Sequence, residues 1–318
     1  MEFREYRPAD SARVLELCRL FETSPFAVDS RFRDLSPHFE PVFAAEMLQA
    51  AFAFTLIAEE KGRVEGFATV GMNPAISGPA RRKVGSILLL AVEQELRGRG
   101  IGSALASKGL AWLRSQGAEL VTVGTDLTNL PAVTVYENLG FRLKSSWHIF
   151  RCYEPAGGIS PEQSSFVDSA RLSTLDPFLE RFDRPVSLLR DSRVDVRSIR
   201  AYLEDGFRRQ LAKEETVCLQ YFEAKRPVAL VAAARDRIAM RTLALERNIY
   251  RISDLIVLPG AASKKAGVEL LLDLRRRLYD TALLEMWVPG DRADLVNDLS
   301  SAGFGHCYTG LSFHLALS

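Results

Sequence analysis

The feature that most constrains the fold is an apolar segment that leads directly into a glycine-rich turn and then into a helical pattern. Residues 84–92 are almost continuously apolar, which predicts a strand buried on both faces. The turn at residues 97–102 follows, and helical spacing then extends from residue 100 to residue 115. Gly117 follows that stretch, as is typical of a helix C-terminus. A strand, a tight turn and a helix in this order predict an α/β fold.

Further elements fit around this unit. Residues 22–42 contain three prolines and show no clear period, and residues 153–161 contain two prolines and two glycines, which predicts a linker. The other elements expected in the first half are a strand at 3–6, a helix from about 8 to 21, a helix at 43–52, strands at 54–59 and 64–70 joined by a hairpin turn at 60–63, a strand at 120–123, a short helix between Asn129 and Gly140, and a strand at 146–152.

The second half repeats this plan, so the chain of 318 residues is expected to hold two domains. Gly140-Phe141 is echoed by Gly303-Phe304, and Val92 by Val257, with a spacing that differs by two residues. The counterparts are a hairpin at 216–221 and 228–234, a strand at 252–258 and a helix at 266–279. We therefore expect an approximate duplication of a whole domain, with boundaries at 1–154 and 160–318.

Bulk properties exclude several classes of protein. The formal net charge is +1, which gives no electrostatic basis for binding nucleic acid or an anionic membrane. The N-terminus has no apolar signal segment, and the apolar runs are far shorter than the ~18 residues of a membrane span. The four cysteines are scattered, and neither they nor the histidines have metal-ligand spacing. We expect a cytoplasmic protein with reduced thiols and no metal site.

The turn at residues 97–102 favours binding of an anion. Its glycines allow the backbone to turn tightly and to approach a ligand closely. The helix that follows points unpaired N–H groups and the positive end of its dipole at the same place, which suits a diphosphate. A plain strand-to-helix turn is the alternative. A dinucleotide fingerprint beginning at Gly98 requires glycine at position 103, where Ser103 stands.

The wider pattern resembles the GNAT superfamily of acetyl-CoA-dependent N-acetyltransferases. The pattern comprises Arg97, Gly100 and Gly102 after an apolar strand, followed by Asn129, Ala132, Tyr136 and Gly140-Phe141. The resemblance implies an α/β fold with a mixed sheet (α+β), in two tandem GNAT-like domains of which the second is degenerate. It also implies that acetyl-CoA binds through the turn and through backbone contacts of the preceding strand, with Leu90, Val92, Arg97, Gly98, Arg99, Gly100, Ile101 and Gly102 as the binding residues.

The same resemblance implies that Tyr136 and Asn129 lie near the thioester sulfur as catalytic residues. A phenol with a pKa of about 10 can donate a hydrogen bond or a proton to a leaving thiolate whose thiol has a pKa of about 8.5. Such a role is typically worth ~10² to 10⁴ in rate. The structural alternatives are a tyrosine packed on a helix face and an asparagine that caps a helix.

The general base is left open. Many family members carry a glutamate on the strand before the turn, and the matching positions here are Ser86 and Leu88. Glu93 and Asp126 are nearby in sequence, but each fits a surface or capping carboxylate better, and a chain of waters to backbone carbonyls is a further alternative. Residues 123–126 and 145–150 are weakly similar to enzymes that acetylate nucleotide-linked amino sugars, and residues 22–42 are where the acceptor pocket is expected.

The second half lacks the groups that carry this chemistry. Only Gly267 recurs from the turn, and Leu299 occupies the place of Tyr136. Lys264 and Lys265 are expected in a solvated loop. The sequence thus predicts direct transfer of an acetyl group from acetyl-CoA to a small-molecule primary amine by the first domain, with an amino sugar as one acceptor class. A non-catalytic acetyl-CoA-binding or interaction module and a nucleotide-binding enzyme are the alternatives.

Overall fold

The computed structural model describes residues 1–18, 45, 48–73, 77–78, 81–152, 164–166, 178, 196–211, 213, 215–235, 248–260, 265–278 and 282–317. The chain forms two compact units. The first comprises Met1–Ser146, Ser187–Ile199 and Thr309–Ser318, and the second comprises Trp147–Val186 and Arg200–Tyr308. The first unit thus includes a segment from the far end of the sequence. The functional division at 154 and 160 stays a prediction.

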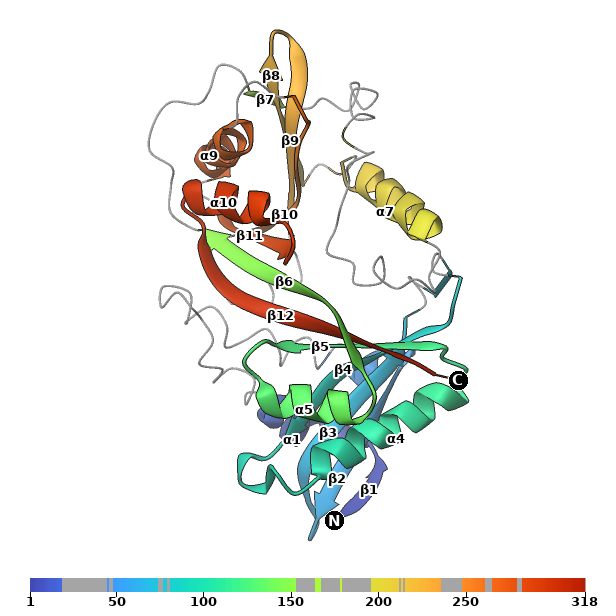
Figure 1. Cartoon of the computed structure of the whole chain (residues 1–318). Coiled ribbons are helices and arrows are strands. Elements are labelled where there is room, and N and C mark those ends of the chain that lie inside the picture. The colour runs from blue at the N-terminus through green and yellow to red at the C-terminus, as the bar shows by residue number, and fades with distance from the viewer. Residues whose placement is uncertain are drawn as a thin grey trace. The chain divides into compact units, whose positions relative to one another are not determined.

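The first unit is built on a mixed sheet (Figure 1). Neighbouring strands are antiparallel except β4 and β5, which are parallel. In spatial order the strands are β1 (Glu2–Glu5), β2 (Ala53–Glu60), β3 (Arg63–Met72), β4 (Val84–Val92), β5 (Leu120–Asp126) and the C-terminal part of β12 (Gly305–Ala316). The hairpin turn predicted at 60–63 is confirmed. Lys61 and Gly62 both have positive φ, 52° and 79°, as the right-handed twist of the two strands requires.

Helices cover both faces of this sheet. On one face, Val14 and Leu17 of α1 (Ser11–Cys18) pack against Ile57, Phe67 and Leu89. The other face carries α4 (Ile101–Ser115) and α5 (Leu130–Asn138), whose apolar side chains pack on alternate residues of the strands. Two 3₁₀ turns, Pro8–Asp10 and Gln94–Leu96, precede α1 and α4. The predicted C-terminal cap of α4 is confirmed, since Gly117 has a φ of 77°.

The place beside β5 is taken by the end of the last strand. Residues 310–316 of β12 pair with β5 in antiparallel register, from Gly310 opposite Asp126 to Ala316 opposite Leu120. Phe313 is 1% exposed and lies in the core of the first unit. No local pattern in the first half of the sequence indicates this strand.

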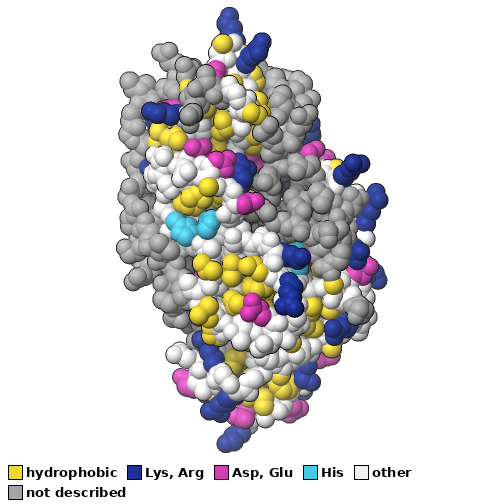
Figure 2. Space-filling view, viewed as in Figure 1, with side chains coloured by type: hydrophobic (Ala, Val, Ile, Leu, Met, Phe, Trp, Pro, Cys, Tyr) yellow, Lys and Arg dark blue, Asp and Glu magenta, His cyan; other side chains and the backbone are white. Residues whose placement is uncertain are grey.

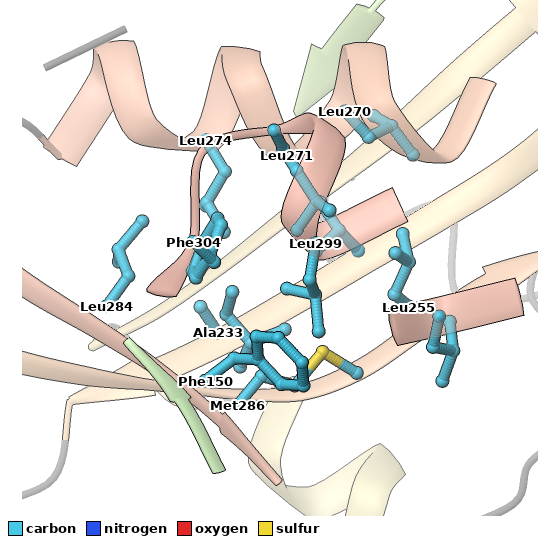
Figure 3. Close-up of a cluster of buried hydrophobic side chains, with 14 of the residues drawn as sticks. Phe150, Ala233, Leu255, Leu270, Leu271, Leu274, Leu284, Met286, Leu299 and Phe304 are labelled. Carbon is cyan, nitrogen blue, oxygen red and sulfur yellow. The ribbon is translucent and has the colours of Figure 1, made fainter. Parts of the chain in front are cut away.

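The second unit repeats the mixed sheet. Its strands, in spatial order, are β6 (Arg142–Cys152, from Trp147 onward), β11 (Ala282–Pro289), β10 (Asn248–Val257), β9 (Arg226–Arg235), β8 (Thr216–Glu223) and β7 (Ser164–Phe166). Its helices are α7 (Val196–Leu211, from Arg200 onward), α9 (Ala266–Leu278) and α10 (Ala293–Ser301). Side chains from α9 and α10 meet those of the sheet in an apolar core that includes Leu271, Leu299, Phe304, Phe150 and Met286 (Figure 3).

Matching backbone geometry supports the duplication. The register of β4 against β3 shifts at Leu88, and that of β10 against β9 shifts at Ser253, which is 165 positions later. The turns after α5 and α10 also match. Phe141 N–H donates to the carbonyl of Tyr136 over 3.0 Å, and Phe304 N–H donates to that of Leu299 over 2.9 Å. Tyr136 and Leu299 therefore hold equivalent positions in the two units, as expected from the sequence.

Some expectations need correction. Strand β4 is not buried on both faces along its whole length, because Leu88, Leu90 and Val92 are only partly buried. Strand β6 begins at residue 142 instead of 146, and α7 was not expected. The predicted segments at 22–42 and 153–161 lie outside the described residues, as do residues 43, 44, 46 and 47 of the helix expected at 43–52; residues 45, 48 and 49 of that segment are helical.

The surface shows no large region of one charge on the face seen in Figure 2, where basic and acidic side chains of the described residues are interspersed. All four cysteines are buried. Within the described ranges, no helix is long and apolar enough to cross a membrane.

Candidate active site

Strands β4 and β5 are neighbours only over their first halves. Parallel pairing runs from Val84 opposite Leu120 to Ile87 opposite Val123. At the next residue of β4, Leu88, the register with β3 shifts, and the strand then continues to Val92. In the described structure this second half of β4 has no strand paired on its β5 side. An extended ligand can therefore pair with it as an added strand.

The turn after β4 has the conformation that glycine permits. Gly98 and Gly100 have φ values of 78° and 80°, a region that other residues rarely adopt. Gly100 is the N-cap of α4, and no side chain caps this helix end. The first amides of an α-helix have no partner within the helix, so those of Ile101 and Gly102 remain available to a ligand.

There is room for a ligand at Gly102. A Cβ atom placed on Gly102 meets only Val92 Cγ2, at 3.8 Å, which is an ordinary contact. Both arginines of the turn are exposed. Arg97 Nε donates a hydrogen bond to the carbonyl of Val92 over 3.2 Å, which ties the turn to the end of β4. The six predicted turn residues and the end of β4 thus lie together around an open helix terminus.

Tyr136 lies on α5, at the end of the neighbouring strand β5. Its side chain is 4% exposed, and its ring contacts Phe141 and Phe313 at centroid distances of 5.8 and 6.2 Å. Burial raises the pKa of Tyr136 to about 12. The phenol therefore stays protonated at any physiological pH and is suited to donate a hydrogen bond, not to act as a base.

Sequence comparison identifies this region. Residues 16–141 match the pattern described as the Acetyltransferase (GNAT) family. This stretch contains the place where β4 and β5 separate, the turn at residues 97–102 and Tyr136. Residues 16–141 therefore belong to the GNAT family by sequence, and the part of the first unit that they form is called the GNAT domain below.

Several curated relatives of the chain are mycothiol acetyltransferases. The protein of this name from Arthrobacter sp. is 34% identical over 119 residues, which cover 36% of this chain and 35% of that protein. The one from Salinispora tropica is 31% identical over 146 residues, or 43% of each chain. The matched stretches thus span less than half the length of these relatives.

Solved structures match the whole chain in fold. A GCN5-related N-acetyltransferase from Sphaerobacter thermophilus aligns over 99% of this chain and 95% of its own, with a TM-score of 0.64 and 14% identity. A tandem GNAT protein from the clavulanic acid biosynthesis pathway aligns over 99% and 98%, with a TM-score of 0.60 and 14% identity. The predicted tandem GNAT fold is confirmed.

Asn129 of the GNAT domain acts as a helix cap. It is the N-cap residue of α5, and its Oδ1 accepts a hydrogen bond from Ala132 N–H over 3.3 Å. The structural alternative for this residue is thus present in the fold. The cap uses the amide oxygen only, and the side-chain NH₂ group is a separate pair of donors.

The carboxylates near the site differ in their surroundings. Glu93 forms ion pairs with Arg13 and Arg63 and accepts a hydrogen bond from Gln94 N–H. Although burial acts in the opposite direction, these contacts hold the pKa of Glu93 below its usual value, so Glu93 is a poor general base. Asp126 accepts hydrogen bonds from the N–H and hydroxyl of Thr128. Ser86, at a position where many family members carry glutamate, hydrogen-bonds Thr122.

The corresponding place in the second unit is filled by the protein itself. Gly267, in the first turn of α9, corresponds to Gly102, and each faces the Cγ2 of the corresponding valine. A Cβ atom on Gly267, however, also collides with Oδ2 of Asp298. A carboxylate therefore lies against the helix start that is open in the GNAT domain.

Two residues of the site region were not found from the sequence. Phe313 packs against Tyr136 from β12, 177 positions away, and Asp298 reaches α9 from α10. Neither belongs to a local motif, because each contact exists only through tertiary structure. The equivalence of Leu299 and Tyr136 was the one sequence signal that could have pointed to Asp298, because Asp298 directly precedes Leu299.

Proposed function

We propose that the first unit transfers an acetyl group from acetyl-CoA directly to a primary amine, and that the second unit has no catalysis of its own. The observation that carries this proposal is the uncapped start of α4 beside the unpaired half of β4. Family membership supports use of acetyl-CoA. The described residues fit that ligand for two reasons. The start of α4 is open to an anion, and the unpaired second half of β4 can pair with the extended pantetheine arm.

The start of α4 and the second half of β4 would bind different parts of acetyl-CoA. The amides and glycines of the turn, from Arg97 through Gly102, would hold the pyrophosphate with help from the helix dipole. The backbones of Leu90 and Val92 would pair with the pantetheine arm. When bound, acetyl-CoA supplies an activated thioester whose sulfur can leave.

Tyr136 would then serve the leaving group. The amine nitrogen bonds to the carbonyl carbon as the carbon–sulfur bond breaks, and the sulfur departs with negative charge. A phenol with a pKa near 12 holds its proton and can donate a hydrogen bond to that sulfur. This donation stabilises the transition state more than the ground state, which is the requirement for catalysis. The proton lost by the amine passes to water. The amide NH₂ of Asn129 would donate to the same region.

The names of the relatives favour one class of acceptor. Several are mycothiol acetyltransferases, and one structure of similar fold contains a glucosamine N-acetyltransferase region, with a TM-score of 0.64 and 13% identity. Together with the sequence similarity at residues 123–126 and 145–150, these names favour an amine on a sugar or a sugar conjugate as the acceptor.

The proposal is tested by measuring thiol release from acetyl-CoA with a panel of amino sugars, polyamines and amino acids. We expect turnover with at least one amine and, by calorimetry, one acetyl-CoA bound per chain. Binding without turnover for every amine would favour a non-catalytic module, and tighter binding of NAD or ATP than of acetyl-CoA would favour a nucleotide-binding enzyme. Two equivalent sites would overturn the division of labour between the units.

A further inference from the structure

Asp126 carries a buried oxygen that the fold does not use. Its side chain is 8% exposed. Oδ1 accepts from Thr128 N–H over 2.7 Å and from Thr128 Oγ1 over 2.6 Å. Oδ2 is also buried, and none of the described residues donates a hydrogen bond to it.

The turn after β5 does not explain this carboxylate. An Asx turn requires one side-chain oxygen, which asparagine supplies as well as aspartate. Burying a second, charged oxygen without a donor is unfavourable. A buried polar atom in this state calls for a reason outside the local fold, and a ligand that supplies the missing donor is one such reason.

The side chain of Asp126 points to the face of the sheet opposite the one that packs against Tyr136. Val121 and Val123 share a core with Tyr136. Because side chains alternate along a strand, Asp126 points to the other face, as does Thr122. On that face Thr122 Oγ1 lies 2.8 Å from Ser86 Oγ, so the surroundings of the split are polar. Asp126 is also the last residue of β5, where β4 and β5 no longer pair.

In the part of the second unit that the structure describes, no carboxylate takes the position equivalent to Asp126. In both units the turn after the strand is closed by the same backbone hydrogen bond, from Asn129 N–H to Asp126 O over 3.1 Å and from Arg292 N–H to Pro289 O over 3.0 Å. Pro289 therefore occupies the place of Asp126. The carboxylate is absent from the same unit that has Leu299 in place of Tyr136.

We propose that Oδ2 of Asp126 binds the ammonium group of the acceptor, which selects cationic primary amines and positions their nitrogen at the split between β4 and β5. This inference rests on the proposed function of the first unit and adds the residue that recognises the acceptor. An ammonium group supplies both the hydrogen-bond donor and the opposite charge that Oδ2 lacks. The bound ammonium loses one proton to water before its nitrogen attacks the thioester carbon.

The test compares Asp126→Asn with Glu137→Gln, which makes the same charge change at an exposed position of α5. The amide oxygen introduced by Asp126→Asn remains an acceptor for Thr128. We expect the KM for the amine to rise by ~10- to 100-fold in Asp126→Asn, as for loss of a hydrogen bond to a charged group, with an unchanged Kd for acetyl-CoA. Glu137→Gln should leave both values unchanged. An unchanged amine KM in Asp126→Asn overturns the proposal.

A second measurement separates this inference from the proposed function. The Tm of wild type with bound coenzyme A is measured with and without millimolar amines from the panel. If no amine is acetylated, the proposed function fails, yet a Tm increase in wild type that is lost in Asp126→Asn still supports recognition by Asp126. An equal increase in both proteins, or none in wild type, overturns it. Asp126→Ser, which also accepts from the turn, serves if Asp126→Asn does not fold, and misfolding of both makes Asp126 structural.

Discussion

The starts of α4 and α9 show how two copies of one backbone plan come to differ at a helix terminus. Each helix begins after a strand with a bulge, and each has a glycine in its first turn that faces a valine of that strand. At α4 the space beyond the glycine is open, whereas at α9 it holds the carboxylate of Asp298. The dipole of a helix favours an anion at this end. In the second unit an internal carboxylate thus occupies the place that corresponds to the proposed pyrophosphate site of the first unit.

The same contrast extends to the next helix. Tyr136 and Leu299 are both buried beside a glycine–phenylalanine turn with positive φ at the glycine, 89° and 80° respectively. Asn129 caps its helix with a side chain, while Arg292 does not and pairs with Asp294 instead. The packing is retained where the polar groups are lost, because an apolar core requires volume and not chemistry.

The largest expected effect is that of removing the hydroxyl of Tyr136. Tyr136→Phe keeps the contacts with Phe141 and Phe313, so the fold should be unchanged. We expect kcat to fall by ~10² to 10⁴ while the Kd for acetyl-CoA stays the same, measured by steady-state kinetics and calorimetry. Tyr250→Phe, in the second unit, is the matched control and should leave both kcat and the Kd for acetyl-CoA unchanged. An unimpaired single-turnover rate in Tyr136→Phe would make the phenol structural.

The next effect comes from placing a carboxylate at α4, as in the second unit. Gly102→Asp should weaken coenzyme A binding by ~100-fold, since it fills the space for the pyrophosphate and repels its charge, and the lost hydrogen bonds involve a charged partner. Gly102→Asn has the same size without the charge and should bind more tightly than Gly102→Asp. Calorimetry measures both. Wild-type affinity in a folded Gly102→Asp protein would contradict the assignment of the pyrophosphate site.

Alanine at the two equivalent glycines should have effects of opposite sign. Gly267→Ala forces a Cβ into Asp298 and should lower the free energy of unfolding by ~1 kcal/mol. Gly102→Ala meets only an ordinary contact and should raise it by up to ~1 kcal/mol through helix propensity. Denaturant unfolding measures both changes. Adding Asp298→Ala to Gly267→Ala should restore stability, and failure to do so would show that the carboxylate is not the obstacle.

The smallest effect concerns pH. Burial, with repulsion from Asp294, raises the pKa of Asp298 to about 6 from 3.8. Between these two values the folded state binds more protons than the unfolded state, so stability is expected to fall as the pH rises from about 4 to about 6. Asp298→Asn should remove that part of the dependence, as measured by Tm against pH. Superimposable profiles of the two proteins would show that the carboxyl group titrates normally.

Local elements of the fold were predictable because each is encoded by a short pattern. The hairpin at Lys61-Gly62, strand β4 and the cap at Gly117 all follow from turn chemistry and apolar runs, and the structure confirms them. Helix α7 was not recognised, because most of its residues are polar and Gly206 lies within it. The pairing of β12 with β5 joins segments about 190 positions apart, and no periodicity within either segment encodes its partner.

Family resemblance selected the turn and Tyr136 as the candidate site, and their roles stay predictions. The structure adds what surrounds these residues. The sequence around Asp126 indicates an Asx turn and gives no sign that one oxygen lacks a donor. Burial of that oxygen depends on neighbouring strands, so it appears only in three dimensions.

The position of residues 309–318 has a consequence for how the protein is made. The first unit lacks the strand beside β5, and Tyr136 lacks its neighbour Phe313, until those residues have left the ribosome. Translation at ~5 to 20 residues per second separates residue 146 from residue 309 by roughly 10 to 30 s. During that time the nascent first unit exposes an unpaired β5 edge, which is a hazard for aggregation. Completion of the first unit therefore has to wait for synthesis of most of the second unit, although the turn at residues 97–102 is translated before it.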